Sequence, residues 1–235
     1  MLRIEKTVLP SPEQWEIIIE GMRNPMNSWE KSDSYATHIE NPETLNTADF
    51  EFFVGKNDLD LMQRLAKGGS VHAKYRRMIP VYLTLTAPLY WWKEFDTYKV
   101  GTVCNSCSTM HKLHEKEFTL DDFSHEHLIG GVAIVDGEDV YLPPLNILRA
   151  KVFTLNMFRR KYLATNDKMW WRQMIQLLPS SYNQKRTVML NYEVLANIYH
   201  SRKGHKLDEW HSFCEWIETL PYAELITGKG GEDNV

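Results

Sequence analysis

One apolar stretch, residues 78–92, is the longest in the chain and most constrains its fold. Two prolines and two threonines interrupt it, so we expect no membrane-spanning helix there. Between Val81 and Ala87 the apolar side chains alternate with Tyr and Thr, which is the two-residue period of a β-strand. Pro88 ends the alternation. The sequence therefore predicts a β-strand at this point, in a chain that spans no membrane.

The composition fits one large globular domain, or at most two small ones. The 235 residues are 43% hydrophobic and 12% aromatic, which is enough to bury a sizeable core. We expect a single domain over residues 1–235, with an N-terminal helix and loops in 1–56 and a polar tail in 227–235. Because 27 Lys and Arg face 31 Asp and Glu, the net charge is −4. No global positive field would attract nucleic acid or an anionic membrane.

Cysteine usage bears on the compartment. Three cysteines in a chain of this length give no disulfide framework and favour a reducing environment. The first residues lack the basic and then apolar layout of a secretory signal. We therefore expect a cytoplasmic protein.

Local signals place the first helix. Ser11 is the expected N-cap, Pro12 the first helical residue, and Gln14 the partner of Ser11 in a capping box. Residues 24–56 show no clear period and predict long surface loops, with one strand at Phe50–Val54.

Further helices follow along the chain. Asn57 can cap the second helix, and Gly68-Gly69 supplies a left-handed stop. Residues 91–114 predict a short helix or irregular segment and then a loop that opens a helix. The remaining helices are expected at 145–163, 166–178, 186–202 and 207–220.

Two clusters in the sequence contain residues that can bind metals. Cys104 and Cys107 have the spacing of half a zinc site, and His111 and His114 are the nearest candidates for the other half. Only three residues separate the two pairs, whereas zinc sites separate them by about a dozen. Small buried thiols around a tight turn are the better interpretation. His125–His127 has no third ligand in view and fits a solvated loop, so we expect no metal.

A charged residue on an apolar face gives a sharper signal. In the helix predicted for 186–202, Asn191 and Arg202 share one stripe with two aliphatic residues. A buried guanidinium needs an acceptor. That acceptor is either a core carboxylate, such as Glu209 or Glu215, or an anionic or carbonyl-rich ligand.

The chain from residue 57 to 220 resembles the flavin-dependent thymidylate synthases, most clearly near its end. The matching residues, in order, are Leu178-Pro179, eleven residues, Asn191, five residues, Asn197, four residues, Arg202, and then Trp210. In that family the two amides belong to the flavin site, and the arginine holds the uracil ring of dUMP. His72 falls on a histidine of the family that contacts the flavin.

The middle of the resemblance is looser. The family has Arg-His-Arg, seven residues, Ser, one residue and Arg, with an Asn three residues before the Ser. Here the same register gives Tyr98-Lys99-Val100, Asn105, Ser108 and Met110. Three arginines that bind flavin and substrate phosphate in the family are therefore replaced. The nearest basic substitutes are Lys99 and Lys185-Arg186, and Arg76-Arg77 is a pair that the usual pattern lacks.

The resemblance implies a fold, an assembly and a reaction. The fold would be α+β, an antiparallel-rich sheet with long helices, in a homotetramer whose active sites draw on several subunits. The reaction would be reductive C5-methylation of dUMP to dTMP, with FAD as cofactor, methylenetetrahydrofolate as one-carbon donor and NADPH as reductant. The cofactor-binding residues would be His72, Lys99, Asn105, Asn191 and Asn197. The substrate-binding residues would be Arg202, Ser108, Thr109, Lys185 and Arg186.

Two alternatives remain open. The protein could use flavin and folate on another pyrimidine deoxynucleotide, or stop at a hydroxymethyl group, since the altered residues are those that contact phosphate and base. It could also be a non-catalytic homologue that binds flavin or nucleotide. The matches at five family positions argue against the non-catalytic alternative; they are His72, Asn105, Asn191, Asn197 and Arg202.

Overall fold

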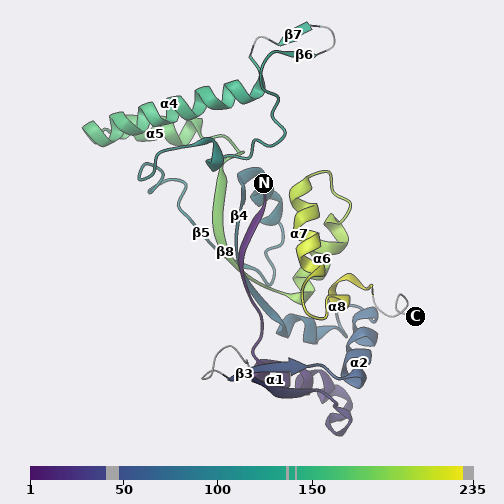
Figure 1. Ribbon diagram of the computed structural model, residues 1–235. Coiled ribbons are helices and arrows are strands. Elements are labelled where there is room, and N and C mark those ends of the chain that lie inside the picture. Colours follow the sequence, from purple (N-terminus) through teal and green to yellow (C-terminus); the bar gives the residue numbers. More distant parts are fainter. Residues whose placement is uncertain (41–47, 136–137, 141, 230–235) are drawn as a thin grey trace. The chain divides into compact units, whose positions relative to one another are not determined.

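The computed structural model describes residues 1–40, 48–135, 138–140 and 142–229 (Figure 1). The chain divides into two compact units, each built from separate segments of the sequence. The first unit consists of Met1–Glu5, Thr84–Thr97 and Asn105–Thr187, and the second of Lys6–Leu83, Tyr98–Cys104 and Val188–Val235. Most of the polar tail expected at 227–235 lies outside the described residues.

Strands and helices are mixed along the chain, so the α+β fold class is confirmed. A four-stranded sheet has the order β1-β4-β8-β5, and two antiparallel hairpins pair β2 with β3 and β6 with β7. The strands are β1 Arg3–Val8, β2 Tyr35–Glu40, β3 Ala48–Phe53, β4 Pro80–Pro88, β5 Val103–Ser106, β6 Ala133–Val135, β7 Glu138–Val140 and β8 Asn183–Asn191. Strand β4 matches the expected alternation, because its odd-numbered residues from 81 to 87 are all buried.

The helices mostly lie where periodicity places them. They are α1 Pro12–Arg23, α2 Lys56–Lys67, α3 Leu89–Phe95, α4 Pro144–Thr165, α5 Lys168–Leu177, α6 Tyr192–Arg202, α7 Asp208–Glu218 and α8 Glu224–Thr227. The capping box of Ser11 and Gln14 is present at the start of α1. Helices α4 and α5 pack side by side in the first unit (Figure 1). Within the described ranges, no helix combines the length and apolar content that a membrane span requires.

The prediction of a helix at 186–202 is wrong for residues 186–191. Residues up to Asn191 form strand β8, in which Gln184, Val188 and Leu190 are buried while Lys185 is exposed. This two-residue period and the pairing of β8 within the sheet outweigh the weak helical pattern. Asn191 is therefore not on the helical stripe. It is the N-cap of α6.

The described part of segment 24–56 contains strand β2 as well as β3, whereas the sequence predicts loops with a single strand. The start of α2 also differs from the expectation. Gly55, and not Asn57, occupies the N-cap position, and the carboxylate of Asp33 accepts the backbone N–H groups of Asn57 and Asp58 at 2.9 and 3.1 Å. A cap supplied from more than twenty residues away leaves no local sequence signal.

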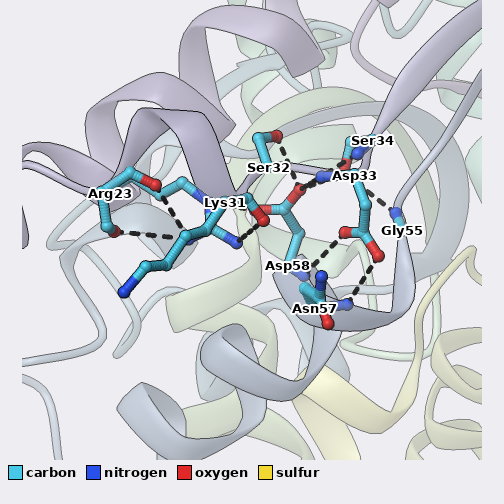
Figure 2. A network of polar contacts seen from close by, with 9 residues as sticks. Arg23, Lys31, Ser32, Asp33, Ser34, Gly55, Asn57 and Asp58 are labelled. Atoms are coloured by element: carbon cyan, nitrogen blue, oxygen red, sulfur yellow. Dashed lines mark hydrogen bonds and ion pairs between the residues drawn. The ribbon is translucent and has the colours of Figure 1, made fainter.

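A buried ion pair joins α1 to α2 in the second unit (Figure 2). Arg23 Nε donates to Asp58 Oδ1 at 2.6 Å, and both side chains are almost completely buried. Asp58 Oδ2 accepts from the Ser32 hydroxyl, the Asp33 backbone, and both the backbone and the hydroxyl of Ser34. The carboxylate thereby fixes the segment Ser32–Ser34, which directly precedes β2.

These contacts set the ionisation of Asp58. Burial by itself raises the pKa of this carboxyl group. Hydrogen bonds from Ser34, Ser32 and Arg23 outweigh burial and leave the pKa of Asp58 below its ordinary value. The carboxylate form is therefore the one that stabilises the fold.

We predict that Asp58→Asn lowers the free energy of unfolding by about 3–5 kcal/mol at neutral pH, because Arg23 keeps a buried charge without its partner. A lowered folded pKa makes this contribution complete above the ordinary carboxyl pKa of about 3.9, and the contribution is lost as the pH falls through the folded pKa. Urea unfolding of both proteins at several pH values measures it, and the difference between them should shrink in acid.

The matched control is Asp60→Asn on the same helix, which removes an exposed ion pair with Arg64. That variant should lose at most about 1 kcal/mol. Equal losses in the two variants would contradict a special role for Asp58.

Candidate functional site

The ten expected site residues divide equally between the two units. Ser108, Thr109, Asn105, Lys185 and Arg186 belong to the first unit, and His72, Lys99, Asn191, Asn197 and Arg202 belong to the second.

Arg202, the last residue of α6, contacts two aromatic side chains. Its Nε donates to the Tyr98 hydroxyl at 2.9 Å, and its guanidinium carbon lies 4.8 Å from the centre of the Trp210 ring. The two rings meet edge to face, with centroids 6.2 Å apart. These contacts hold the guanidinium in one orientation while the side chain stays partly exposed. In the sequence, Tyr98 is recognisable only as a replaced family arginine, because no local pattern links residues about a hundred positions apart.

Asn191 lies at the opposite end of α6, where its side-chain oxygen accepts the backbone N–H of Val194 at 3.1 Å. Gly101 packs against this cap with φ +81°, and a Cβ at Gly101 would lie 3.1 Å from Asn191 Nδ2. A side chain at residue 101 would therefore be strained and crowded. Tyr98 contacts the last residue of α6, and Gly101 packs against the N-cap of the same helix. Residues 98–101 therefore run along the length of α6.

The other expected cofactor residues of the second unit are exposed. The side chains of His72, Lys99 and Asn197 form no hydrogen bond or ion pair with the described part of the chain. On α6, Asn197 and Arg202 are five residues apart, which places them about 140° apart around the helix axis. The structure thus brings Arg202 together with Tyr98, but it does not bring Asn197 next to Arg202.

The loop at Ser108 does not open a helix, contrary to the expectation. The Ser108 hydroxyl accepts the backbone N–H groups of Met110 and His111, at 3.2 and 2.9 Å. Residues 107–119 form bends and turns, and the Trp171 ring nitrogen donates to the Met110 carbonyl at 2.9 Å. The backbone groups are thus used by side chains instead of by a helix. Ser108 is exposed, but two of the N–H groups beside it already have an acceptor.

The two basic residues of β8 have acidic partners within the first unit. Lys185 forms an ion pair with Glu5. Arg186 pairs with Asp96 at 2.7 Å, and its guanidinium stacks on the Trp92 ring at 4.2 Å. Both cations therefore contribute to the packing of this unit.

The cysteines near β5 are exposed, and the expectation of buried thiols is wrong. Cys104 lies in β5, and Cys107 follows that strand, where its backbone N–H donates to the Lys185 carbonyl at 2.9 Å. Their segment is thus a sheet edge and not a tight turn. Among the described residues, no three His, Cys, Asp or Glu side chains converge as a metal site. His127 is exposed in a turn, as expected for a solvated loop.

We predict that a Cys104→Ser/Cys107→Ser variant stays within about 0.5 kcal/mol of the wild-type stability, because both side chains are exposed. Cys214→Ser is the contrasting control, since Cys214 is buried and its burial raises the pKa of the thiol to about 11.

In the wild type, two thiols should react quickly with a disulfide reagent and one slowly. One equivalent of zinc in the purified protein, lost in the double variant, would show that the metal-free interpretation is wrong.

Several solved structures have a fold similar to that of this chain. No protein-family model and no curated protein matches the chain. A thymidylate synthase X (ThyX) from Helicobacter pylori with FAD and dUMP matches with TM-score 0.61 and 16% identity over 97% of both chains. A second Helicobacter pylori ThyX complex with FAD and dUMP gives TM-score 0.60 at 15% identity, covering 97% of this chain and 98% of that one.

A third match is a UMP/dUMP methylase, PolB, from Streptomyces cacaoi, bound with 5-Br dUMP. Its TM-score is 0.55 at 13% identity, over 97% of this chain and 94% of that one. These matches run almost end to end, whereas the sequence identities are low. Over nearly its whole length, the chain has the fold of the flavin-dependent thymidylate synthases.

Proposed function

We propose that this protein binds FAD and a pyrimidine deoxynucleotide and catalyses flavin-dependent C5-methylation of dUMP to dTMP. Methylenetetrahydrofolate would be the one-carbon donor and NADPH the reductant. The observation that carries the proposal is the fixed, partly exposed guanidinium of Arg202, in a fold shared with proteins crystallised with FAD and dUMP. The expected homotetramer and cytoplasmic location belong to the same proposal.

The residues in the expected positions have the chemistry to hold a flavin. His72, Lys99, Asn105 and Asn197 are exposed, and their side chains form no hydrogen bond or ion pair with the described residues. Asn191 uses its oxygen as a helix cap, which leaves the amide Nδ2 as a donor. Amide, imidazole and ammonium donors suit the ring carbonyls and the diphosphate of FAD. A bound flavin would supply hydride-transfer chemistry.

Arg202 would act on the uracil ring. Its guanidinium donors would bind a ring carbonyl and draw electron density toward it, which makes C5 nucleophilic. Tyr98 and Trp210 hold the guanidinium before substrate arrives, so little reorganisation is needed. No side-chain nucleophile is required for this role, because the protein binds and polarises the ring.

A second candidate concerns the substrate. The family arginines at Tyr98, Val100 and Met110 are missing, and Lys185 and Arg186, the expected replacements, already pair with acidic residues. One structure of this fold is a UMP/dUMP methylase. These observations favour methylation or hydroxymethylation of another pyrimidine nucleotide as the alternative. A non-catalytic homologue would also bind flavin or nucleotide but would show no turnover.

Exposed apolar side chains support assembly of several copies. On α4, Ile147, Phe153 and Leu163 are large apolar residues that face solvent in the single chain. Contact with another copy would remove them from water. Light scattering of the purified protein measures the assembly that the homotetramer proposal requires.

The flavin part of the proposal is tested by incubation with excess FAD. We expect flavin absorbance to remain with the protein after desalting, and the melting temperature to rise with FAD concentration. At about a hundredfold excess over Kd, the stabilisation should be about 2.7 kcal/mol. Loss of all flavin on desalting, together with an unchanged melting temperature, would refute the flavin site.

The nucleotide part is tested at Arg202. Arg202→Gln should weaken dUMP binding by about 1.5–3 kcal/mol, the contribution of a charge-assisted hydrogen bond, while the protein remains folded. Lys206→Gln is the matched control, because it removes an exposed cation close to the end of the same helix. Calorimetric titration with dUMP, dCMP and dTMP measures the affinities. Unchanged affinities in Arg202→Gln would remove this residue from the site, and tighter wild-type binding of dCMP than of dUMP would favour the alternative substrate.

A further inference from the structure

A separate cavity of about 200 Å³ lies in the second unit, among α2, α6, α8 and the 3₁₀ turn Lys74–Met78. Its polar lining comes from Gln63, Lys67, Arg76, His200 and Glu224. Neither Arg202 nor any expected flavin residue lines it. It is therefore a different place from the site proposed above.

Arg76 is the buried member of this lining. Only 8% of its surface is exposed, yet its guanidinium forms no hydrogen bond with the described residues. Its ion-pair partner is Glu193, with Nε and Oε2 3.5 Å apart, and both atoms are buried without a hydrogen bond. Buried donors of this kind are nearly always satisfied in folded proteins. The Nε donor faces Glu193, whereas the terminal nitrogens of the guanidinium have no acceptor among the described residues, so an acceptor inside the cavity would serve those terminal donors.

The other lining side chains define the chemistry of that acceptor. Gln63 and Lys67 are four residues apart on α2 and share one face of the helix. Neither side chain has a hydrogen-bond or ion-pair partner in the described part of the chain. Together with Arg76 they offer an amide donor and two cationic donors, which suit an oxyanion. His200 adds an imidazole at the edge of the cavity.

Glu224 adds a selective element, because a carboxylate can only accept hydrogen bonds. An oxyanion without a proton would be repelled by it. An oxyanion that retains a proton can donate that proton to Glu224 while its other oxygens accept from Arg76 and Lys67. Hydrogen phosphate has such a proton at neutral pH, and sulfate does not.

We propose that this cavity binds hydrogen phosphate, with Arg76 and Lys67 as donors to its oxygens and Glu224 as acceptor of its proton. The volume is smaller than the roughly 300–1,000 Å³ of pockets that enclose drug-sized molecules, so it holds a single phosphate group. That group is either inorganic phosphate or the phosphate end of a nucleotide. The proposal does not depend on the methylation reaction.

The test measures the binding of inorganic phosphate and sulfate by calorimetry in the purified full-length protein. Phosphate should bind the wild type, and sulfate should bind at least about tenfold more weakly. Lys67→Gln should weaken phosphate binding about tenfold or more, the effect of a lost charge-assisted hydrogen bond. Arg77→Gln is the matched control, since Arg77 is the exposed neighbour of Arg76 and does not line the cavity. It should bind phosphate like the wild type.

Two further variants keep the test decisive. Arg76→Gln/Glu193→Gln removes both buried charges together, so it should fold and lose phosphate binding. Glu224→Gln should fold and lose most of the preference for phosphate over sulfate. Competition by dUMP that depends on Lys67 would assign the phosphate to a nucleotide, and no competition would assign it to free phosphate.

Three results would overturn the proposal. They are no phosphate binding by the wild type, equal binding by the wild type and the Arg76→Gln/Glu193→Gln variant, and equal affinity of the wild type for sulfate and phosphate. Failure of FAD or dUMP binding would leave each of these measurements unaffected. The two proposals can therefore fail separately.

Discussion

The ion pair of Arg23 and Asp58 is the constraint on which the N-terminal half of the second unit depends. A carboxylate removed from water must be surrounded by donors, and here they come from α1 and from the loop after it. The same loop supplies Asp33, which caps α2. Helix α2 in turn accepts the Tyr75 hydroxyl at the Met62 carbonyl, 2.8 Å away. This chain of contacts positions the turn that contains Arg76.

The parts of the fold that could be predicted are those determined by residues close to one another in the sequence. Three features each depend on side chains within a few positions of one another: the capping box at Ser11, the alternation in β4 and the helical pattern of α4. The resemblance in motif spacing also led to the correct fold, although fewer than one residue in five is identical to the structures that share it. The spacing between motif residues is retained although few residues are identical, because packing fixes the length of each helix and strand.

What could not be predicted depends on distant partners. Strand β8 is a strand because it pairs within a sheet, and the Ser108 loop is shaped by contacts such as that of Trp171 with Met110. In the candidate site, Tyr98 reaches Arg202 across more than a hundred residues. A sequence window cannot register such contacts. The motif did locate Arg202, but only the structure shows the aromatic side chains that orient it.

The interleaving of the two units has a consequence for how the chain is made. The first unit needs the N-terminal Met1–Glu5 as well as residues up to Thr187, and the second needs segments from near both ends. During synthesis, neither unit has all of its parts until most of the chain has left the ribosome. Contacts between such distant segments slow folding, and incomplete intermediates expose apolar surface meanwhile. Cutting the gene at a unit boundary would therefore not yield an independently folding fragment, and chaperones would have a long interval in which to act.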